Sequence, residues 1–155
     1  MTAPTHITER NGSSRMLLVD DIRPYPEQIR FTLNRLNGTS FWAWSLWRAP
    51  EGADLLESLP ASDEYIHCAG TADALTIEVR KTDAAGTAQQ YVVGKPGAGV
   101  DAGPAAVIRW DDGRHSTTVR PNEVFTADEA AEVFTAYRLQ GAVPDGYALR
   151  ALDLA

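Results

Sequence analysis

The side chains that could perform chemistry in this chain are few and widely separated. The only cysteine, Cys68, directly follows His67, and the other histidines are His6 and His115. Neighbouring residues of a strand point to opposite faces, so His67 and Cys68 cannot form a nucleophile–base pair with each other. Pairing of Cys68 with His115 is geometrically possible, but no sequence pattern supports it. We therefore interpret Cys68 as a small buried core residue.

Metal chemistry has equally little support. Two histidines outside the N-terminal segment and one cysteine are sparse ligands, and neither a Cys-x-x-Cys nor a His-x-x-x-His spacing occurs. Asp20 and Asp21 follow an apolar run, as magnesium ligands do in doubly wound proteins, but the later strand pattern does not fit that fold. A tight turn accounts for Asp111 and Asp112. The sequence therefore predicts no metal and no other cofactor.

The glycine-rich stretch at residues 95–103, KPGAGVDAG, has the glycine density of a phosphate-binding loop. A working loop of that kind presents its backbone N–H groups from the start of a helix. Here Pro104 and a strand-like run follow, and no Gly-Lys-Ser/Thr occurs, so we predict a flexible hairpin connection. No serine lies in a Gly-x-Ser-x-Gly setting either. We expect the chain not to be an enzyme.

Hydrophobic periodicity predicts the elements that position these residues. The polar segment 1–14 is predicted to be a disordered tail, and residues 15–155 a single α+β domain. A helix is expected to open at Pro26 and to stop at Gly38. Strands are predicted at 16–19, 41–47, 64–68, 75–80, 89–93, 106–110, 115–119 and 147–154.

The clearest local signal lies in the last third of the chain. Thr126 and Glu129 have the spacing of a capping box, an apolar stripe follows, and Gly141 is placed to end the helix. Helices thus flank a long run of strands. This order predicts an α+β fold with a mainly antiparallel sheet of about six to seven strands and two principal helices packed on it.

The stretch FWAWSLW at residues 41–47 carries three of the four tryptophans. Alternation places Trp42, Trp44 and Leu46 on one face of a strand and Trp47 on the other. A central strand that fills the core explains this pattern. A surface that awaits a binding partner also explains it, since tryptophan is enriched in binding hot spots.

Composition favours an acidic protein of the cytoplasm. The 155 residues contain one cysteine, which fits a reducing compartment, and no apolar run approaches the length of a membrane span or a secretory signal. The net charge of −7 argues against nucleic acid as a partner. Residues 51–85 hold two basic and eight acidic side chains, a net −6, which could attract a basic partner or simply aid solubility.

Several motifs near the C-terminus resemble immunity proteins of bacterial polymorphic toxin systems. They are Gly94 after the strand-like segment 91–93, the segment 119–124 that leads to the last helix, the helical AAEVF at 130–134, and the Gly-x-x-Pro sequence at 141–144 that follows this helix. The composition, rich in Ala and Arg but poor in Lys, looks actinobacterial. The resemblance implies a cytoplasmic protein that binds a cognate toxin and occludes its active site, and it supplies no catalytic residues.

Under this hypothesis the partner is a toxin protein, with neither nucleic acid nor a membrane involved. The acidic stretch and its neighbouring tryptophan are the predicted contact residues: Trp47, Glu51, Asp54, Glu57, Asp63 and Glu64. An alternative is a small-molecule-binding protein or enzyme with a pocket between sheet and helices, lined by Trp42, Trp44, Tyr65 and His67. A third is an oligomer subunit that buries an apolar face of the tryptophan strand, so the oligomeric state stays open.

Overall fold

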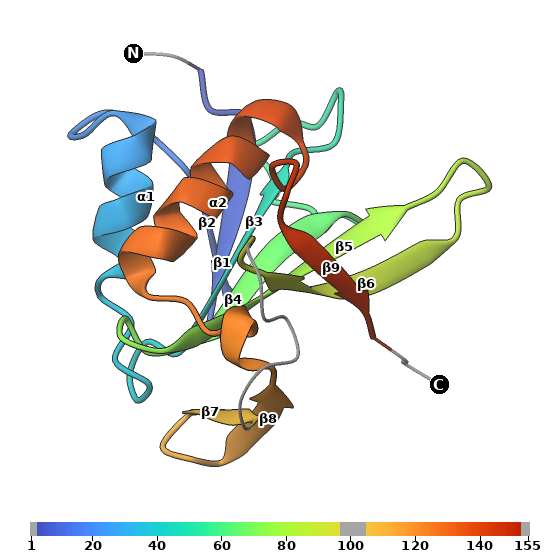
Figure 1. Ribbon diagram of the computed structural model, residues 1–155. Helices are drawn as coiled ribbons and strands as arrows, with labels where there is room; N and C mark the ends of the chain where they lie inside the picture. Colours follow the sequence, from blue (N-terminus) through green and yellow to red (C-terminus); the bar gives the residue numbers. More distant parts are fainter. Residues whose placement is uncertain (1–2, 97–104, 153–155) are drawn as a thin grey trace.

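A seven-stranded antiparallel sheet, a separate two-stranded hairpin and two α-helices make up the computed structural model, which describes residues 3–96 and 105–152 (Figure 1). The strand order in the large sheet is β2-β1-β3-β4-β5-β6-β9. This confirms the predicted α+β class. The strands of the sheet are β1 (His6–Arg10), β2 (Ser14–Leu17), β3 (Ala43–Arg48), β4 (Tyr65–Gly70), β5 (Leu75–Thr82), β6 (Ala88–Gly94) and β9 (Ala148–Ala151).

The predicted disordered tail is wrong for residues 6–10 and for residue 14. Strand β1 pairs with β2 on one side and with β3 on the other, and Ile7 is fully buried. The turn at Asn11 and Gly12, with φ angles of 54° and 72°, closes the β1–β2 hairpin. An Asn-Gly pair is a strong hairpin signal, which the polar composition of the segment obscured.

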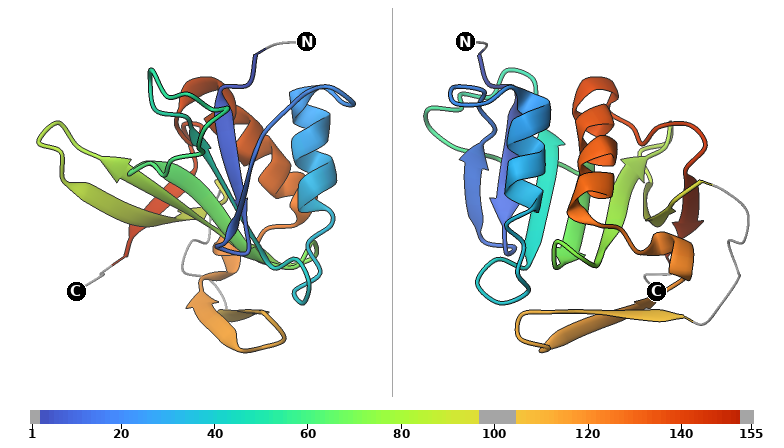
Figure 2. Two further views of the ribbon diagram at one scale, coloured as in Figure 1. Left: turned by 180° about the vertical axis from the view of Figure 1, so that it is seen from behind. Right: turned by 60° about the vertical axis from the view of Figure 1, so that its left-hand side comes forward.

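Both helices, α1 (Tyr25–Leu33) and α2 (Ala127–Gln140), pack against the same side of the sheet (Figures 1 and 2). The predicted capping box is present: the Thr126 hydroxyl accepts from the Glu129 N–H at 3.2 Å, and the Glu129 carboxylate accepts from the Thr126 N–H at 2.9 Å. Gly141 ends α2 in the left-handed conformation. Helix α1 ends earlier than predicted, at Leu33, with Asn34 as its C-cap.

The sheet face beneath the helices forms the main apolar core. Trp44 stacks on Phe134 of α2 with ring centroids 5.5 Å apart, and both side chains are buried. Cys68 lies in the same cluster, which confirms it as a core residue, and burial raises the pKa of its thiol to about 12. His115 is exposed on the small hairpin, so it is no partner for Cys68.

The small hairpin consists of β7 (Ala106–Trp110) and β8 (His115–Val119) and lies at one end of the sheet (Figure 2). Ile108 and Val119 pack on Val92 of β6 as a second apolar cluster, on the sheet face opposite the helices. Gly70 permits this approach, because a Cβ there would lie 3.0 Å from Ile108 and 2.5 Å from the Ala74 carbonyl oxygen. A one-turn 3₁₀ helix, η1 (Pro121–Glu123), lies between β8 and α2 in the chain.

Residues 97–104, which hold most of the predicted glycine-rich connection, lie outside the described residues. In the described part of the chain, no helix has the length and apolar character needed to cross a membrane.

Candidate functional site

A row of polar residues crosses the sheet on the face away from the helices. Glu9 of β1 pairs with Ser45 of β3, Ser45 with His67 of β4, and His67 with Glu78 of β5. Directly paired residues place their side chains on the same face of a sheet. Four strands distant in sequence therefore bring two carboxylates, a hydroxyl and an imidazole into one line, here termed the polar row.

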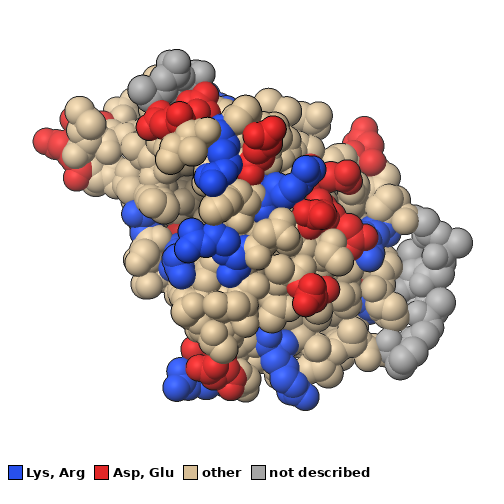
Figure 3. All heavy atoms as spheres, turned by 90° about the vertical axis from the view of Figure 1, so that its left-hand side faces the viewer, with Lys and Arg blue, Asp and Glu red and all other residues tan. Residues whose placement is uncertain are grey.

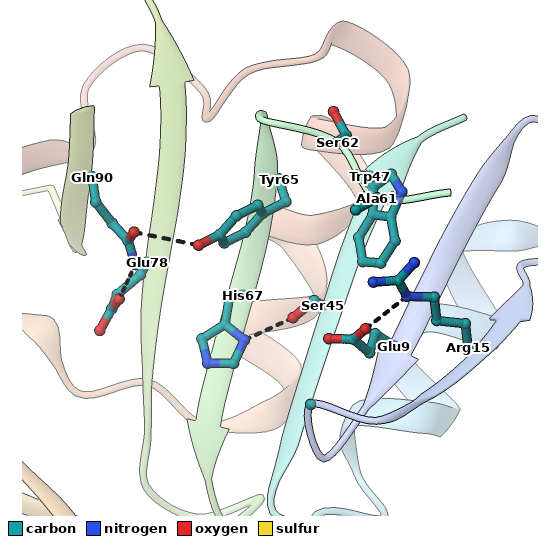
Figure 4. A pocket seen from close by; sticks show the side chains of 11 residues that line it. Glu9, Arg15, Ser45, Trp47, Ala61, Ser62, Tyr65, His67, Glu78 and Gln90 are labelled. Atoms are coloured by element: carbon teal, nitrogen blue, oxygen red, sulfur yellow. Dashed lines mark hydrogen bonds and ion pairs between the residues drawn. The ribbon is translucent and has the colours of Figure 1, made fainter. Parts of the chain in front are cut away.

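The polar row forms the floor of an open pocket of about 370 Å³ (Figure 4). Aromatic side chains from β3 and β4 stand above the floor, and polar side chains from β2 and β6 complete the walls. The residues that matter for the pocket's chemistry are Glu9, Arg15, Ser45, Trp47, Tyr65, His67, Glu78 and Gln90.

One side of the pocket is an arginine site made by the chain itself. The Arg15 Nε donates to the Glu9 carboxylate at 2.8 Å, and its guanidinium lies over the Trp47 ring, 5.4 Å from the centroid. Arg15 also donates to the Leu59 carbonyl at 2.8 Å, while the Trp47 Nε1 donates to the Pro60 carbonyl at 3.0 Å. These bonds fix the acidic connection between β3 and β4 against the end of the sheet.

The opposite side of the pocket holds a second carboxylate. Glu78 accepts a hydrogen bond from the Gln90 side-chain amide, and the Gln90 carbonyl oxygen accepts from the Tyr65 hydroxyl at 3.3 Å. Partial burial raises the pKa of the Tyr65 phenol, so the hydroxyl stays protonated at neutral pH. Glu78, Gln90 and Tyr65 therefore form a connected group that presents a negative charge beside an aromatic ring.

Ser45 and His67 contact each other in the middle of the row, with the Ser45 Oγ 2.7 Å from the His67 Nδ1. Burial lowers the pKa of His67, against the opposing effect of Glu78 and Glu9, so the imidazole is neutral near pH 7. A serine nucleophile needs a base that is oriented by a third group. Among the described residues, no carboxylate hydrogen-bonds or ion-pairs with His67, so the pair lacks that third group.

The predicted pocket between sheet and helices is wrong. Tyr65 and His67 do line a pocket, but on the opposite sheet face, whereas Trp44 lies in the core under the helices. Trp42 is half-buried near the small hairpin, where its ring lies 6.3 Å from that of His115. Alternation explains this difference. The pairing of β3 with β4 puts Tyr65 and His67 on the same sheet face as Trp47, whereas Trp44 points to the opposite face.

The predicted contact residues divide into one buried residue and five exposed ones. Trp47 is only 4% exposed, because the connection to β4 covers it, so it forms a wall of the pocket and not a free surface. The acidic side chains are all exposed: Glu51, Asp54, Glu57, Asp63 and Glu64. On the face that Figure 3 shows, by contrast, acidic and basic side chains are interspersed.

Sequence reasoning missed Glu9, Arg15, Ser45, Glu78 and Gln90 as site residues. Ser45, Glu78 and Gln90 are polar residues on predicted strands whose other face is apolar, and such residues normally face solvent without further role. Alternation assigns these three to the face away from the core, whereas Glu9 and Arg15 lie outside the predicted strands and gave no signal. Strand order, which the sequence did not reveal, decides that these faces adjoin.

Within the described residues, no group of three or more His, Cys, Asp or Glu side chains could hold a metal ion. No protein-family model, no curated protein and no solved structure matches this chain. The geometry of the open sheet face is therefore the basis for any functional conclusion.

Proposed function

We propose that this chain is an immunity protein of a bacterial polymorphic toxin system, which binds a cognate toxin domain in the cytoplasm and occludes its active site. The observation that carries the proposal is the acidic β3–β4 connection, residues 49–64, which holds five acidic and no basic side chains and borders the open face of the sheet. There a pocket with two carboxylates adjoins a connection whose acidic side chains are all exposed. The resemblance of the C-terminal motifs to such immunity proteins also supports this function.

Charge complementarity gives this surface a physical role. A toxin that acts on an anionic substrate has a basic cleft, and an acidic surface both accelerates encounter with that cleft and covers it. The Ser45–His67 pair, which lacks an orienting carboxylate, fits a binding face better than a nucleophilic centre.

The direct test is co-expression with the product of the neighbouring gene, since an immunity gene lies beside its toxin gene. We expect the two proteins to copurify as a stable complex and the chain to abolish the toxicity of its neighbour. A neighbour that is neither toxic nor bound by the chain would refute the proposal.

A charge series tests the surface. Neutralising Glu51, Asp54 and Glu57 as Glu51→Gln, Asp54→Asn and Glu57→Gln is expected to slow association about tenfold at low salt, and less at high salt. The matched control removes the same charge from exposed positions on α1, α2 and the following turn, as Glu27→Gln, Glu132→Gln and Asp145→Asn. Equal effects of the two triple variants would mean that net charge, not this surface, governs binding.

The pocket also favours a second candidate function, the binding of a small molecule. Its volume of about 370 Å³ lies at the lower end of the range for ligand sites. This candidate predicts that a small molecule copurifies with the native chain and that native mass spectrometry detects it. The complex should be lost when Tyr65→Ala opens the wall of the pocket.

A further inference from the structure

We propose that the open-face pocket is a guanidinium site and that, in the complex, it receives an arginine side chain of the toxin. The identity of the occupant rests on the proposed function, whereas the chemistry of the site rests on the pocket alone. The pocket combines carboxylates with aromatic rings, and these are the groups that bind a planar cation.

The chain itself shows this mode of recognition on one side of the pocket. Arg15 reaches in from β2, with its Nε 2.8 Å from the Glu9 carboxylate and its guanidinium over the Trp47 ring. Carboxylate and aromatic ring thus bind one guanidinium from two directions. Because Arg15 neutralises the charge of Glu9, Glu9 does not decide which ligand the rest of the pocket binds.

The other side of the pocket repeats the pattern with Glu78 and Tyr65. Glu78 is held by the Gln90 amide, which is neutral, and in the described part of the chain it forms no ion pair. The two nearby arginines do not take this role. Arg150 is engaged with Glu123 through bonds of 2.8 and 2.9 Å. Arg80 pairs with Tyr65 and Gln90 on the same sheet face, but it lies outside the lining of the pocket and, among the described residues, forms no ion pair with Glu78.

The charge balance of the pocket favours a cation. Its lining holds two carboxylates, Glu9 and Glu78, and one basic side chain, Arg15, which gives a net −1. His67 adds no charge at neutral pH, because its Nδ1 is bonded to Ser45 and the ring is neutral. We expect a guanidinium that enters beside Glu78 to contact its carboxylate and the Tyr65 ring, which lie on the same side of the pocket (Figure 4).

A titration of the full chain with Nα-acetyl-arginine amide, followed by two-dimensional NMR, tests the site. We expect saturable shifts of the Tyr65 and His67 resonances and no such shifts with the citrulline analogue, which has the same shape without the charge. The absence of saturable shifts with the arginine derivative, or equal shifts with both compounds, would overturn the proposal.

Variants locate the interaction. Glu78→Gln keeps the shape of the side chain and should weaken binding of the arginine derivative at least about tenfold, as expected for the loss of a charged hydrogen bond. Glu132→Gln, at an exposed position of α2, removes the same charge from the opposite side of the sheet and should leave the affinity unchanged. Tyr65→Leu provides a second probe that should weaken binding severalfold. Unchanged affinity in folded Glu78→Gln or Tyr65→Leu would overturn the assignment.

The same variants separate this inference from the proposed function. If the toxin binds wild-type and Glu78→Gln protein equally well, the arginine assignment fails and the immunity function stands. If the arginine derivative binds as expected but no toxin does, the immunity function fails and the guanidinium site stands.

Discussion

The two faces of the large sheet differ in almost every physical respect, although the same strands build both. The face under α1 and α2 is a continuous apolar core in which Trp44, Ile66 and Val79 are almost fully buried. The opposite face carries the polar row Glu9, Ser45, His67 and Glu78, partly covered at its ends by the β3–β4 connection and the β7–β8 hairpin.

Because of this difference, we expect one face of the sheet to govern the stability of the fold and the other to govern binding. Substitutions under the helices should act on the free energy of unfolding, because they leave cavities or lose packing. Substitutions on the open face should act mainly on ligand or partner binding, because the polar row is partly solvated and contributes less to burial. Substitutions on the two faces therefore test the two sides of this contrast.

The largest expected effect lies on the helix-covered face. Phe134→Ala removes a fully buried ring that stacks on Trp44, and we expect a loss of about 3–5 kcal/mol in the free energy of unfolding. Denaturant titration measures this loss, with binding to the arginine derivative retained under conditions where the variant is folded. A loss below about 1 kcal/mol would contradict the assignment of the core to this face.

The next effect concerns the ion pair that joins η1 to β9. The Glu123 side chain is only 3% exposed and accepts two hydrogen bonds from Arg150. Glu123→Gln leaves Arg150 without its charged partner and should cost about 3 kcal/mol of unfolding free energy. The paired variant Glu123→Gln with Arg150→Met should recover part of this loss; if it is no more stable than the single variant, the two side chains are not coupled.

Acidification should destabilise both faces through their histidines. The pKa of His6, buried beside α2, is lowered from 6.5 to about 4 by burial and by Arg138 and Arg48, and the pKa of His67 is also lowered. The unfolded chain therefore binds protons below pH 6.5 that the folded chain does not. The contribution of His6 to stability is complete above that pH and is lost as the pH falls toward 4, and the contribution of His67 is lost in the same direction.

Between pH 6.5 and pH 5, His6 alone should account for a loss of about 1.5 kcal/mol in the free energy of unfolding. Denaturant titrations at both pH values measure it, and His6→Gln should flatten the profile. This window lies above the range in which the carboxylates protonate. A profile that is unchanged by His6→Gln would show that His6 does not resist protonation in the folded state.

The smallest effect is expected in the polar row itself. Ser45→Ala removes the partner of the His67 Nδ1 and should reduce the free energy of unfolding by only about 1 kcal/mol. Thermal unfolding measures this change, and the pKa of His67, followed by NMR, should shift as its hydrogen bond is lost. A loss as large as that of Phe134→Ala would erase the proposed contrast between the two faces.

Local sequence patterns predicted the fold class and much of the local structure. The Thr126–Glu129 capping box, the Gly141 stop and the tight turn at Asp111–Gly113 are confirmed, because each depends on residues only a few positions apart. The strand β1 escaped prediction, since its five residues are mostly polar and gain their order from pairing on both edges. The site was predicted less well. Tyr65 and His67 do line a pocket, but the prediction placed them beside Trp42 and Trp44 and on the wrong face of the sheet.

By itself, then, the sequence determined which face each side chain of the predicted strands occupies, the ends of α2 and the acidic character of the connection after β3. Only the tertiary structure decided that β1, β3, β4 and β5 are neighbours, and hence that Glu9, Ser45, His67 and Glu78 form one row. The physical reason is that alternation fixes which face a side chain occupies, whereas strand order and register, set by packing across the whole sheet, fix which side chains meet.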